Sequence, residues 1–297
     1  MQSQVIVPLD GSTCAEAILP HALFFALQTQ SVLTLLRIIM PPGEPEYTVP
    51  YIPDDWYDGE VMWTKNYLTS LATRLQAQGA RMQTQHVQGT LAGAAINSYA
   101  EQHSDVQLIA LATHGRGDGG RLLLGSVAED VLASAPTSLL LLHPPKDEHL
   151  PSGPIARASY QTILVPFDGT ALSERVLEQA TTLALTCHAS IQLVAFPPPL
   201  VEEEMRVDEI EKPLLRVPAH KEKKQTDFLA DQAEQLRTST GLTVQTVVTD
   251  GDPEAFIERF YGQNQQNLLI VTTRKQAEHK VMRFLHQSNA PVLFIAL

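Results

Sequence analysis

Two apolar patterns alternate along the chain. Short, nearly continuous apolar runs, such as Ser138-Leu-Leu-Leu-Leu-His143, predict strands that are buried on both faces. Between these runs, apolar residues recur at helical spacing. The first half has predicted strands at 4–9, 31–39, 81–88, 106–112 and 138–143 and predicted helices at 13–29, 58–78, 91–102 and 125–134. The second half has predicted strands at 161–167, 189–196, 243–249, 268–273 and 291–296 and predicted helices at 171–187, 220–239, 253–264 and 275–287.

This succession is a repeat. Val5-Ile-Val-Pro-Leu-Asp-Gly-Ser12 reappears as Ile163-Leu-Val-Pro-Phe-Asp-Gly-Thr170. We interpret the chain as two copies of one domain, at residues 1–146 and 155–297, joined by a linker rich in proline and charge. Five strands connected by helices predict, for each copy, a doubly wound α/β domain with a five-stranded parallel sheet. The expected strand order is 3-2-1-4-5, with the two domains in tandem.

A glycine-rich loop follows the fourth predicted strand of the first copy. Nine residues after Gly115 comes Gly125-Ser126, and a helical pattern begins there. Glycine lets backbone N–H groups approach a ligand closely, and a helix start carries partial positive charge, so the loop predicts a phosphate site. The loop is no P-loop, since it lacks the lysine and the hydroxyl residue. Gly115-x-Gly117-x-x-Gly120 matches the dinucleotide fingerprint. That fingerprint follows the first strand of its unit, however, whereas this loop follows the fourth, so the match is weak.

A second motif converges on this loop. Asp10 ends the first predicted strand, and in this strand order the carboxyl ends of strands one and four lie side by side. Asp10 binds a ligand or only caps the first helix, and Ser126 binds phosphate, caps the helix that follows it, or does both. His114 contacts phosphate or shapes the loop. Arg116 and Arg121 bind phosphate or are surface charges.

The sequence of this loop resembles the universal stress protein family, from Thr113-His-Gly-Arg116 to Leu124-Gly-Ser-Val-Ala-Glu129, and both halves of the chain are similar to that family. ATP-binding members have Gly-x-x-Gly, nine residues, then Gly-Ser or Gly-Thr; here Ala112 replaces the first glycine and adds a methyl group near the ribose–phosphate path. The resemblance implies that Asp10 hydrogen-bonds adenine and that Ile38 packs beside it. It also implies that Gly115, Arg116, Gly125, Ser126 and Val127 hold the phosphates. The predicted nucleotide site comprises Pro8, Leu9, Asp10, Ile38, Ala112, His114, Gly115, Arg116, Gly125, Ser126 and Val127.

The second copy has a different loop. Ile270-Val-Thr-Thr-Arg-Lys-Gln-Ala-Glu-His-Lys280 contains no glycine, and no Gly-Ser follows. Asp168-Gly-Thr170 remains and predicts a turn with a helix cap. We therefore expect one competent site, in the first copy, and a degenerate second copy. Arg274 and Lys275 leave open a weaker anion site there.

These observations predict an ATP (adenine nucleotide)-binding regulatory protein of the stress response, binding ATP with or without Mg²⁺. One alternative is a slow ATP hydrolase or nucleotidyl-transfer enzyme, which would need a placed general base or a held Mg²⁺. Another is a structural pairing module that binds nothing. The sequence assigns no catalytic residue and no metal ligand; enzymatic activity stays open, and a binding protein is favoured.

Composition and charge indicate which classes of partner the protein is not expected to bind. A net charge of -12 argues against a nucleic-acid-binding surface. The apolar runs are too short to span a membrane, and the first residues lack a signal-peptide pattern, so a cytoplasmic location without a membrane partner is expected. Cys14 and Cys187 are expected to be buried thiols rather than a disulfide.

The fifth strands predict how the copies assemble. Ser138–His143 and Pro291–Ala296 are apolar strands expected at sheet edges, which favour pairing. We predict that the two copies pack through them as an intramolecular pseudo-twofold dimer. Independent domains, or two chains that exchange these edges as a homodimer, are the alternatives.

Overall fold

The computed structural model describes residues 2–41, 55–113, 125–144, 153–196, 219–249, 253–263, 266–272 and 290–296. By its contacts the chain divides into two compact units. Unit 1 comprises Met1–Ser159 together with Val271–Leu297, and unit 2 comprises Tyr160–Ile270. The last part of the sequence therefore belongs by contact to the unit built mainly from the first part.

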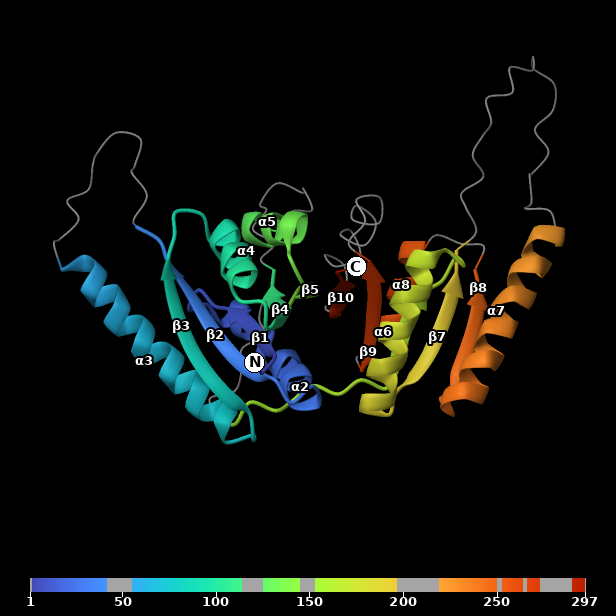
Figure 1. The fold of residues 1–297 in the computed structure, drawn as a ribbon, viewed down its shortest axis with the longest axis horizontal. Coiled ribbons are helices and arrows are strands. Elements are labelled where there is room, and N and C mark those ends of the chain that lie inside the picture. The colour runs from blue at the N-terminus through green and yellow to red at the C-terminus, as the bar shows by residue number, and fades with distance from the viewer. Residues whose placement is uncertain are drawn as a thin grey trace, which may run out of the picture. The chain divides into compact units, whose positions relative to one another are not determined.

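Unit 1 contains the predicted parallel sheet, in the order β3-β2-β1-β4-β5 (Figure 1). This order confirms the 3-2-1-4-5 prediction and makes β1 the central strand, with β2 on one side and β4 on the other. All five residues of β1 are buried, as expected for a strand covered on both faces. The strands are β1 (Gln4–Pro8), β2 (Val32–Ile39), β3 (Arg81–Gln88), β4 (Val106–Ala112) and β5 (Ser138–Leu142).

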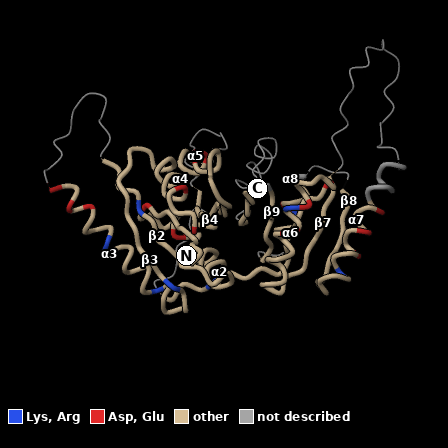
Figure 2. The backbone as a smooth tube through the Cα atoms, in the orientation of Figure 1, with Lys and Arg blue, Asp and Glu red and all other residues tan. Residues whose placement is uncertain are grey.

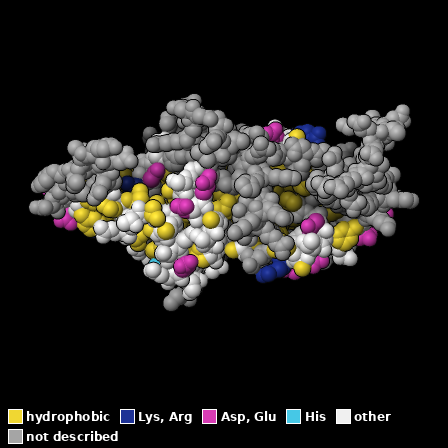
Figure 3. Space-filling model, turned by 90° about the horizontal axis from the view of Figure 1, so that it is seen from above, with side chains coloured by type: hydrophobic (Ala, Val, Ile, Leu, Met, Phe, Trp, Pro, Cys, Tyr) yellow, Lys and Arg dark blue, Asp and Glu magenta, His cyan; other side chains and the backbone are white. Residues whose placement is uncertain are grey.

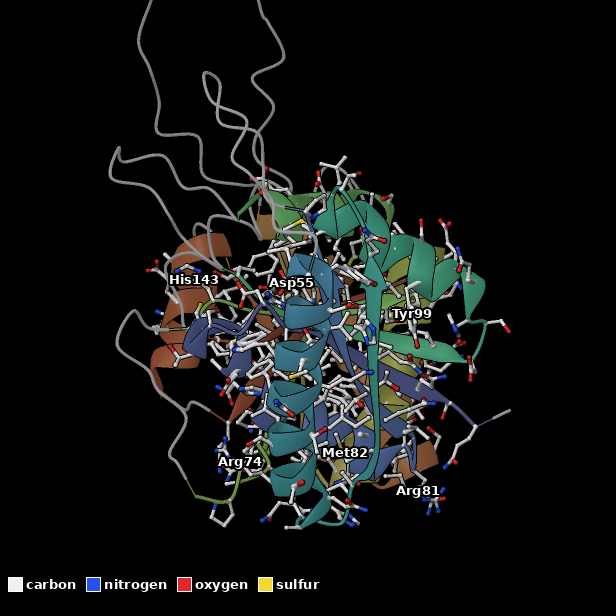
Figure 4. The ribbon with its side chains drawn as sticks, turned by 90° about the vertical axis from the view of Figure 1, so that its left-hand side faces the viewer. Asp55, Arg74, Arg81, Met82, Tyr99 and His143 are labelled. Carbon is white, nitrogen blue, oxygen red and sulfur yellow. The ribbon has the colours of Figure 1, made fainter. Side chains whose placement is uncertain are left out.

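Helices cover both faces of this sheet. Seen from the side of β3, α3 and α4 lie on opposite sides of that strand (Figure 4). Helices α4 and α5 pack tightly, because a Cβ atom on Gly93 would lie 2.4 Å from the Cβ atom of Asp130. The unit 1 helices are α1 (Thr13–Glu16), α2 (Leu19–Gln28), α3 (Trp56–Gln76), α4 (Ala92–Gln102) and α5 (Ser126–Ser134).

The first predicted helix is in fact two helices. The sequence pattern predicts one helix over 13–29, but α1 ends at Glu16 and α2 begins at Leu19. Pro20 lies in the first turn of α2, where its missing N–H group costs nothing. Inside a continuous helix the proline ring would clash with the carbonyl group of residue 16, so the single-helix prediction was wrong.

The edge of β5 is covered by another strand. β10 (Val292–Ile295) pairs with it in antiparallel register, with Val292 opposite Leu141 and Leu293 opposite Leu140. Phe294 is fully buried in this pairing. The two predicted fifth strands are thus paired within unit 1.

Unit 2 repeats the topology with four parallel strands in the order β9-β6-β7-β8. They are β6 (Thr162–Pro166), β7 (Ser190–Ala195), β8 (Val244–Val248) and β9 (Asn267–Thr272). The helices are α6 (Ala171–Cys187), α7 (Ala219–Thr240) and α8 (Pro253–Gln263). The predicted helix at 275–287 lies outside the described residues. No helix among those described is long and apolar enough to cross a membrane.

Candidate functional site

A cavity of about 280 Å³ lies at the carboxyl ends of β1, β2 and β4. Six of the sequence-predicted residues line it: Pro8, Leu9, Asp10, Ile38, Ala112 and Val127. The others in its lining are Ala15, Arg37, Ile39, Met40, Glu60, Ala92, Ile96 and Leu111. Predicted residues His114, Gly115 and Arg116, together with Arg121, lie outside the described residues.

The cavity position follows from the strand order. Successive connections leave the central strand toward opposite sides, so a crevice forms where the order reverses. Leu9 extends β1 by one residue, since its N–H group donates to the carbonyl oxygen of Leu36 at 2.9 Å. Asp10 then stands at the rim, exposed, as the chain turns toward α1. Asp10, Ala112 at the end of β4 and Val127 of α5 therefore line one cavity at this edge of the sheet.

Asp10 shapes the turn that it ends. Its Oδ1 accepts a hydrogen bond from the N–H group of Ser12 at 2.8 Å, and Ser12 Oγ in turn accepts from Ala15 at 3.1 Å. Gly11 has φ +88°, and a Cβ atom there would lie 2.6 Å from Cη2 of Trp63. Ser12 is thus the N-cap residue, while Asp10 supports the turn and also lines the cavity.

The sequence analysis missed Arg37 and the aromatic residues beside it. The Arg37 guanidinium lies 5.2 Å from the ring centroid of Trp63, and its Nη1 donates to the carbonyl oxygen of Leu9 at 3.4 Å. Arg37 Nε is buried and has no hydrogen-bond partner among the described residues. One signal could have revealed it, because Arg37 is the only charged residue in the apolar run Val32-Leu-Thr-Leu-Leu-Arg-Ile-Ile39.

Trp63 is itself held in place. It stacks on Tyr67 with ring centroids 5.1 Å apart, and Tyr67 Oη donates to Glu16 Oε1 at 3.0 Å. Burial, and then the nearby Glu16 carboxylate, raise the pKa of Tyr67, so its hydroxyl stays protonated as the donor. A chain of contacts from α1 through α3 therefore fixes the aromatic face on which Arg37 rests.

The start of α5 has no side-chain cap among the described residues. Gly125 occupies the N-cap position with φ +89° and has no side-chain oxygen to accept from the first N–H groups of the helix. Ser126 is the first helical residue and is exposed, so the interpretation of Ser126 as the cap was wrong. The cap conformation lies in the left-handed region of φ, which glycine adopts readily and serine does not.

Charge is unevenly distributed along the cavity rim. Helix α3 carries Asp58 and Glu60 in its first turns and its basic residues further along (Figure 2), and Glu60 lines the cavity. Burial, and then Asp10, raise the pKa of the Cys14 thiol, whose sulfur lies 3.7 Å from the carbonyl oxygen of Thr113. Cys14 is therefore a neutral, partly buried thiol at this edge.

Hydrophobic side chains are exposed near the cavity. The large ones in unit 1 include Met40, Tyr57, Met62 and Trp63, and hydrophobic side chains are visible on the described surface seen from above (Figure 3). Met40 also lines the cavity. Among the described residues, no group of His, Cys, Asp or Glu side chains is arranged to hold a metal ion. Apolar walls with a few polar groups suit an organic ligand.

The equivalent positions in unit 2 carry aromatic residues. Pro8 pairs with Leu36 in unit 1 and Pro166 pairs with Val194 in unit 2, which aligns the two β-strand pairs. By this alignment Leu9 corresponds to Phe167, Arg37 to Ala195 and Ile38 to Phe196. Ile96, Tyr99 and Ala100 of α4 have the same spacing as the buried Ile257, Phe260 and Tyr261 of α8, which places Phe256 where unit 1 has Ala95.

These aromatic residues contact one another. Phe196 and Phe256 meet edge to face with centroids 5.8 Å apart, and Phe167 stacks on Phe228 of α7 at 5.8 Å. Two residues that line the unit 1 cavity, Leu9 and Ile38, thus correspond to larger side chains in unit 2.

The strand order and the cavity define unit 1 as a doubly wound α/β domain with a site at its switch point. The sequence profile of the Universal stress protein family matches residues 1–143 and again 159–294. The chain therefore belongs to the universal stress protein family and carries two copies of its domain. No curated protein matches the chain.

Two solved structures show the same fold along nearly the whole chain. A universal stress protein from Archaeoglobus fulgidus DSM 4304 has a TM-score of 0.66 at 14% identity, covering 98% of this chain and 95% of that chain. A functionally unknown protein from Pseudomonas aeruginosa PAO1 has a TM-score of 0.62 at 14% identity, covering 99% of this chain and 92% of that chain. At this identity the likeness is one of fold alone.

Proposed function

We propose that the chain is an ATP (adenine nucleotide)-binding regulatory protein of the stress response, with one site per chain, in unit 1. The observation that carries this proposal is the cavity at the switch point, where Asp10, Ile38, Ala112 and Val127 lie together. Its volume of about 280 Å³ is near the lower end for small-molecule sites, roughly 300–1,000 Å³. Such a space suits the nucleoside part of the ligand.

The cavity has two chemically different sides. The side of β2 is walled by Ile38 and, from α4, by Ile96, which suit the faces of a base. The side of β4 leads to Gly125 and α5, whose first N–H groups suit phosphate oxygens. The two strand ends are separated by β1, hence by about 10 Å. Glu60 on the α3 side would repel phosphate, so we orient the base toward β2 and the phosphates toward α5.

Ala112 is compatible with this orientation. It lies at the end of β4, is 5% exposed and lines the cavity. Its methyl group occupies the space between the two sides, where the ribose would pass. ATP then binds with or without Mg²⁺, since any metal would accompany the phosphates outside the apolar walls.

The aromatic residues of unit 2 support a single site. Phe196 stands at the position of Ile38, which flanks the proposed base, and contacts Phe256 there. The sequence of the loop after β9 also lacks the glycines on which phosphate binding by backbone N–H groups depends.

Calorimetric titration of the full chain with ATP tests the proposal, together with mass spectrometry of any nucleotide that co-purifies. We expect a stoichiometry of one per chain. Two equivalent sites, or no binding of any adenine nucleotide, would overturn it.

We further propose that the β5–β10 pairing forms within one chain and makes the two copies an intramolecular pair. Leu140 and Leu293 lie directly opposite each other, so cysteines at both positions should crosslink on oxidation. The background is a variant without Cys14 and Cys187. Crosslinked monomers are expected on a denaturing gel at all protein concentrations; crosslinks found only between chains would instead show exchanged edges.

A further inference from the structure

Arg37 is a charged residue at the otherwise apolar end of β2. It lines the cavity, and its Nη1 donates to the carbonyl oxygen of Leu9 over a long distance of 3.4 Å. Its Nε is buried with no hydrogen-bond partner among the described residues and is closed to a ligand, so contact with a ligand falls to the terminal N–H groups. A guanidinium can only donate, so a ligand that meets these groups must offer an acceptor.

The guanidinium is also held in one place. It rests on the face of Trp63, which stacks on Tyr67, and Tyr67 is anchored by its hydrogen bond to Glu16. A donor that is fixed before the ligand arrives loses little conformational freedom on binding. This support is what a recognition group requires, and a solvated surface arginine would not need it.

We propose that Arg37 reads the base, with a terminal N–H group of its guanidinium donating to a ring-nitrogen acceptor of the purine. The inference rests on the nucleotide site proposed above and adds a specificity-determining residue to it. Adenine offers ring nitrogens as acceptors and an exocyclic amino group as a donor. Arg37 at the end of β2 and the carboxylate of Asp10 at the end of β1 therefore supply opposite hydrogen-bonding types to one base edge.

Phosphate is the other acceptor that an arginine commonly takes, and the geometry argues against it. Arg37 lies on β2, two strands from β4 and the start of α5. The same cavity is lined by Ile38, Ile39 and the acidic Glu60. Apolar walls suit a base, and a carboxylate in the lining opposes a phosphate. In unit 2 the corresponding residue is Ala195, which has no donor.

The first experiment compares the wild-type chain with Arg37→Met, which keeps an apolar side chain against Trp63 but removes the donors. Titrations with ATP and with adenosine should both show about 10- to 100-fold weaker binding, the size expected for losing a hydrogen bond from a charged group. Arg81→Met is the matched control: Arg81 is exposed at the start of β3, and with Arg74 it lies at the opposite end of unit 1 from Asp55 and His143 (Figure 4). It should leave both affinities unchanged.

The second experiment identifies the acceptor and does not depend on how a variant folds. Wild-type chain is titrated with 1-deaza-, 3-deaza- and 7-deazaadenosine, each lacking one ring nitrogen. One analogue should bind about 10- to 100-fold more weakly than adenosine, and in Arg37→Met that same analogue should bind as adenosine does.

The outcomes separate the two proposals. If the wild-type chain binds no adenine nucleotide, the proposed function fails and this inference falls with it. If ATP binds but none of the three analogues loses affinity, the base-reading role of Arg37 is wrong while the nucleotide site stands. A loss in Arg37→Met with ATP but not with adenosine would mean a phosphate contact and would likewise overturn it.

Discussion

The two copies of the domain share their turns but differ in the residues around the cavity. After the first strand of each unit, an aspartate accepts from the residue two positions on, at 2.8 Å for Asp10 and 3.0 Å for Asp168. A glycine with positive φ follows, and an aromatic side chain lies over it, Trp63 in unit 1 and Phe228 in unit 2. The turn therefore serves the fold, since it persists where the predicted ligand loop does not.

What differs is the space beyond the turn. Partial burial tends to raise the pKa of Asp168, but hydrogen bonds from Thr170 and Ser173 outweigh this and lower it. The Asp168 carboxylate thus accepts hydrogen bonds from the residues at the start of α6. In unit 1 the cavity opens beside the corresponding residue, and in unit 2 phenylalanines stand at two of the cavity positions, those of Leu9 and Ile38. Side-chain size, rather than backbone topology, distinguishes the two units.

Converting the unit 1 cavity into its unit 2 counterpart should have the largest effect. In Leu9→Phe/Ile38→Phe, the added rings should occupy the proposed base site and weaken ATP binding by at least about 1,000-fold, roughly 4 kcal/mol. Thermal unfolding should change little, because the rings enter existing space rather than a filled core. ATP affinity is measured by calorimetry.

The reciprocal change in unit 2, Phe167→Leu/Phe196→Ile, serves as the control. It alters the two corresponding positions without touching unit 1, so the affinity of unit 1 should be preserved. Normal ATP binding by the unit 1 double variant would show that the cavity is not the base site.

The start of α5 gives the next largest expected effect. Gly125→Val should weaken ATP binding by about 100-fold, roughly 2.7 kcal/mol, because the branched side chain would hinder approach of phosphate to the N–H groups. Valine at φ +89° is also strained, so a control with the same strain is needed. Gly79→Val provides it, at φ +91° with open space around the glycine. Equal losses of affinity in both variants would remove Gly125 from the site.

A histidine makes one unit sensitive to acid. Burial lowers the pKa of His21 in α2 to about 4, below its ordinary value of 6.5. Between pH 4 and pH 6.5 the unfolded chain binds a proton that the folded chain does not. The contribution of neutral His21 to the free energy of unfolding is therefore fully present above pH 6.5 and is lost as the pH falls toward 4. We expect a loss of about 2 kcal/mol in the free energy of unfolding over that range.

Unit 2 supplies the comparison for His21. The equivalent residue in α6 is Gln179, since Ala22 and Ala180 beside them are both fully buried. His21→Gln should therefore flatten the dependence of stability on pH between 6.5 and 4, as followed by urea denaturation at several pH values. An unchanged slope would assign the acid sensitivity to other groups.

The smallest expected effect concerns base preference. Asp10→Ala should reduce the preference for ATP over GTP by about 10-fold, roughly 1.4 kcal/mol, because a carboxylate accepts from the exocyclic amine of adenine. Asp168→Ala removes the same kind of turn in unit 2 and should leave the preference unaltered. If the Asp10 variant still separates the two nucleotides as well as wild type does, Asp10 serves the turn alone.

The sequence predicted the fold well because its signals are local and periodic. Apolar runs and the repeated Val-Pro-x-Asp-Gly turn determine strands, their order and the position of the crevice. The break between α1 and α2 was missed since the apolar pattern continues across it, and only Pro20 marks it.

The site was predicted less completely. Residues next to a motif, such as Leu9 and Val127, were found, whereas Arg37, Glu60 and Ile96 lie far from any motif and meet the cavity only through packing. The aromatic residues of unit 2 became interpretable only once strand register aligned them with unit 1. A sequence pattern shows which face a side chain occupies, but not which side chains meet across a cavity.

The pairing of β5 with β10 has a consequence for synthesis of the protein on the ribosome. Leu139 and Phe294 pair although roughly 150 residues separate them. Synthesis proceeds at about 5–20 residues per second, so β10 follows β5 after an interval on the order of ten to thirty seconds. Until then the edge of β5 lacks its partner strand. During that interval an apolar strand edge is available to any neighbouring chain. Nascent chains emerging from adjacent ribosomes on one message are therefore where exchanged dimers of this protein would arise.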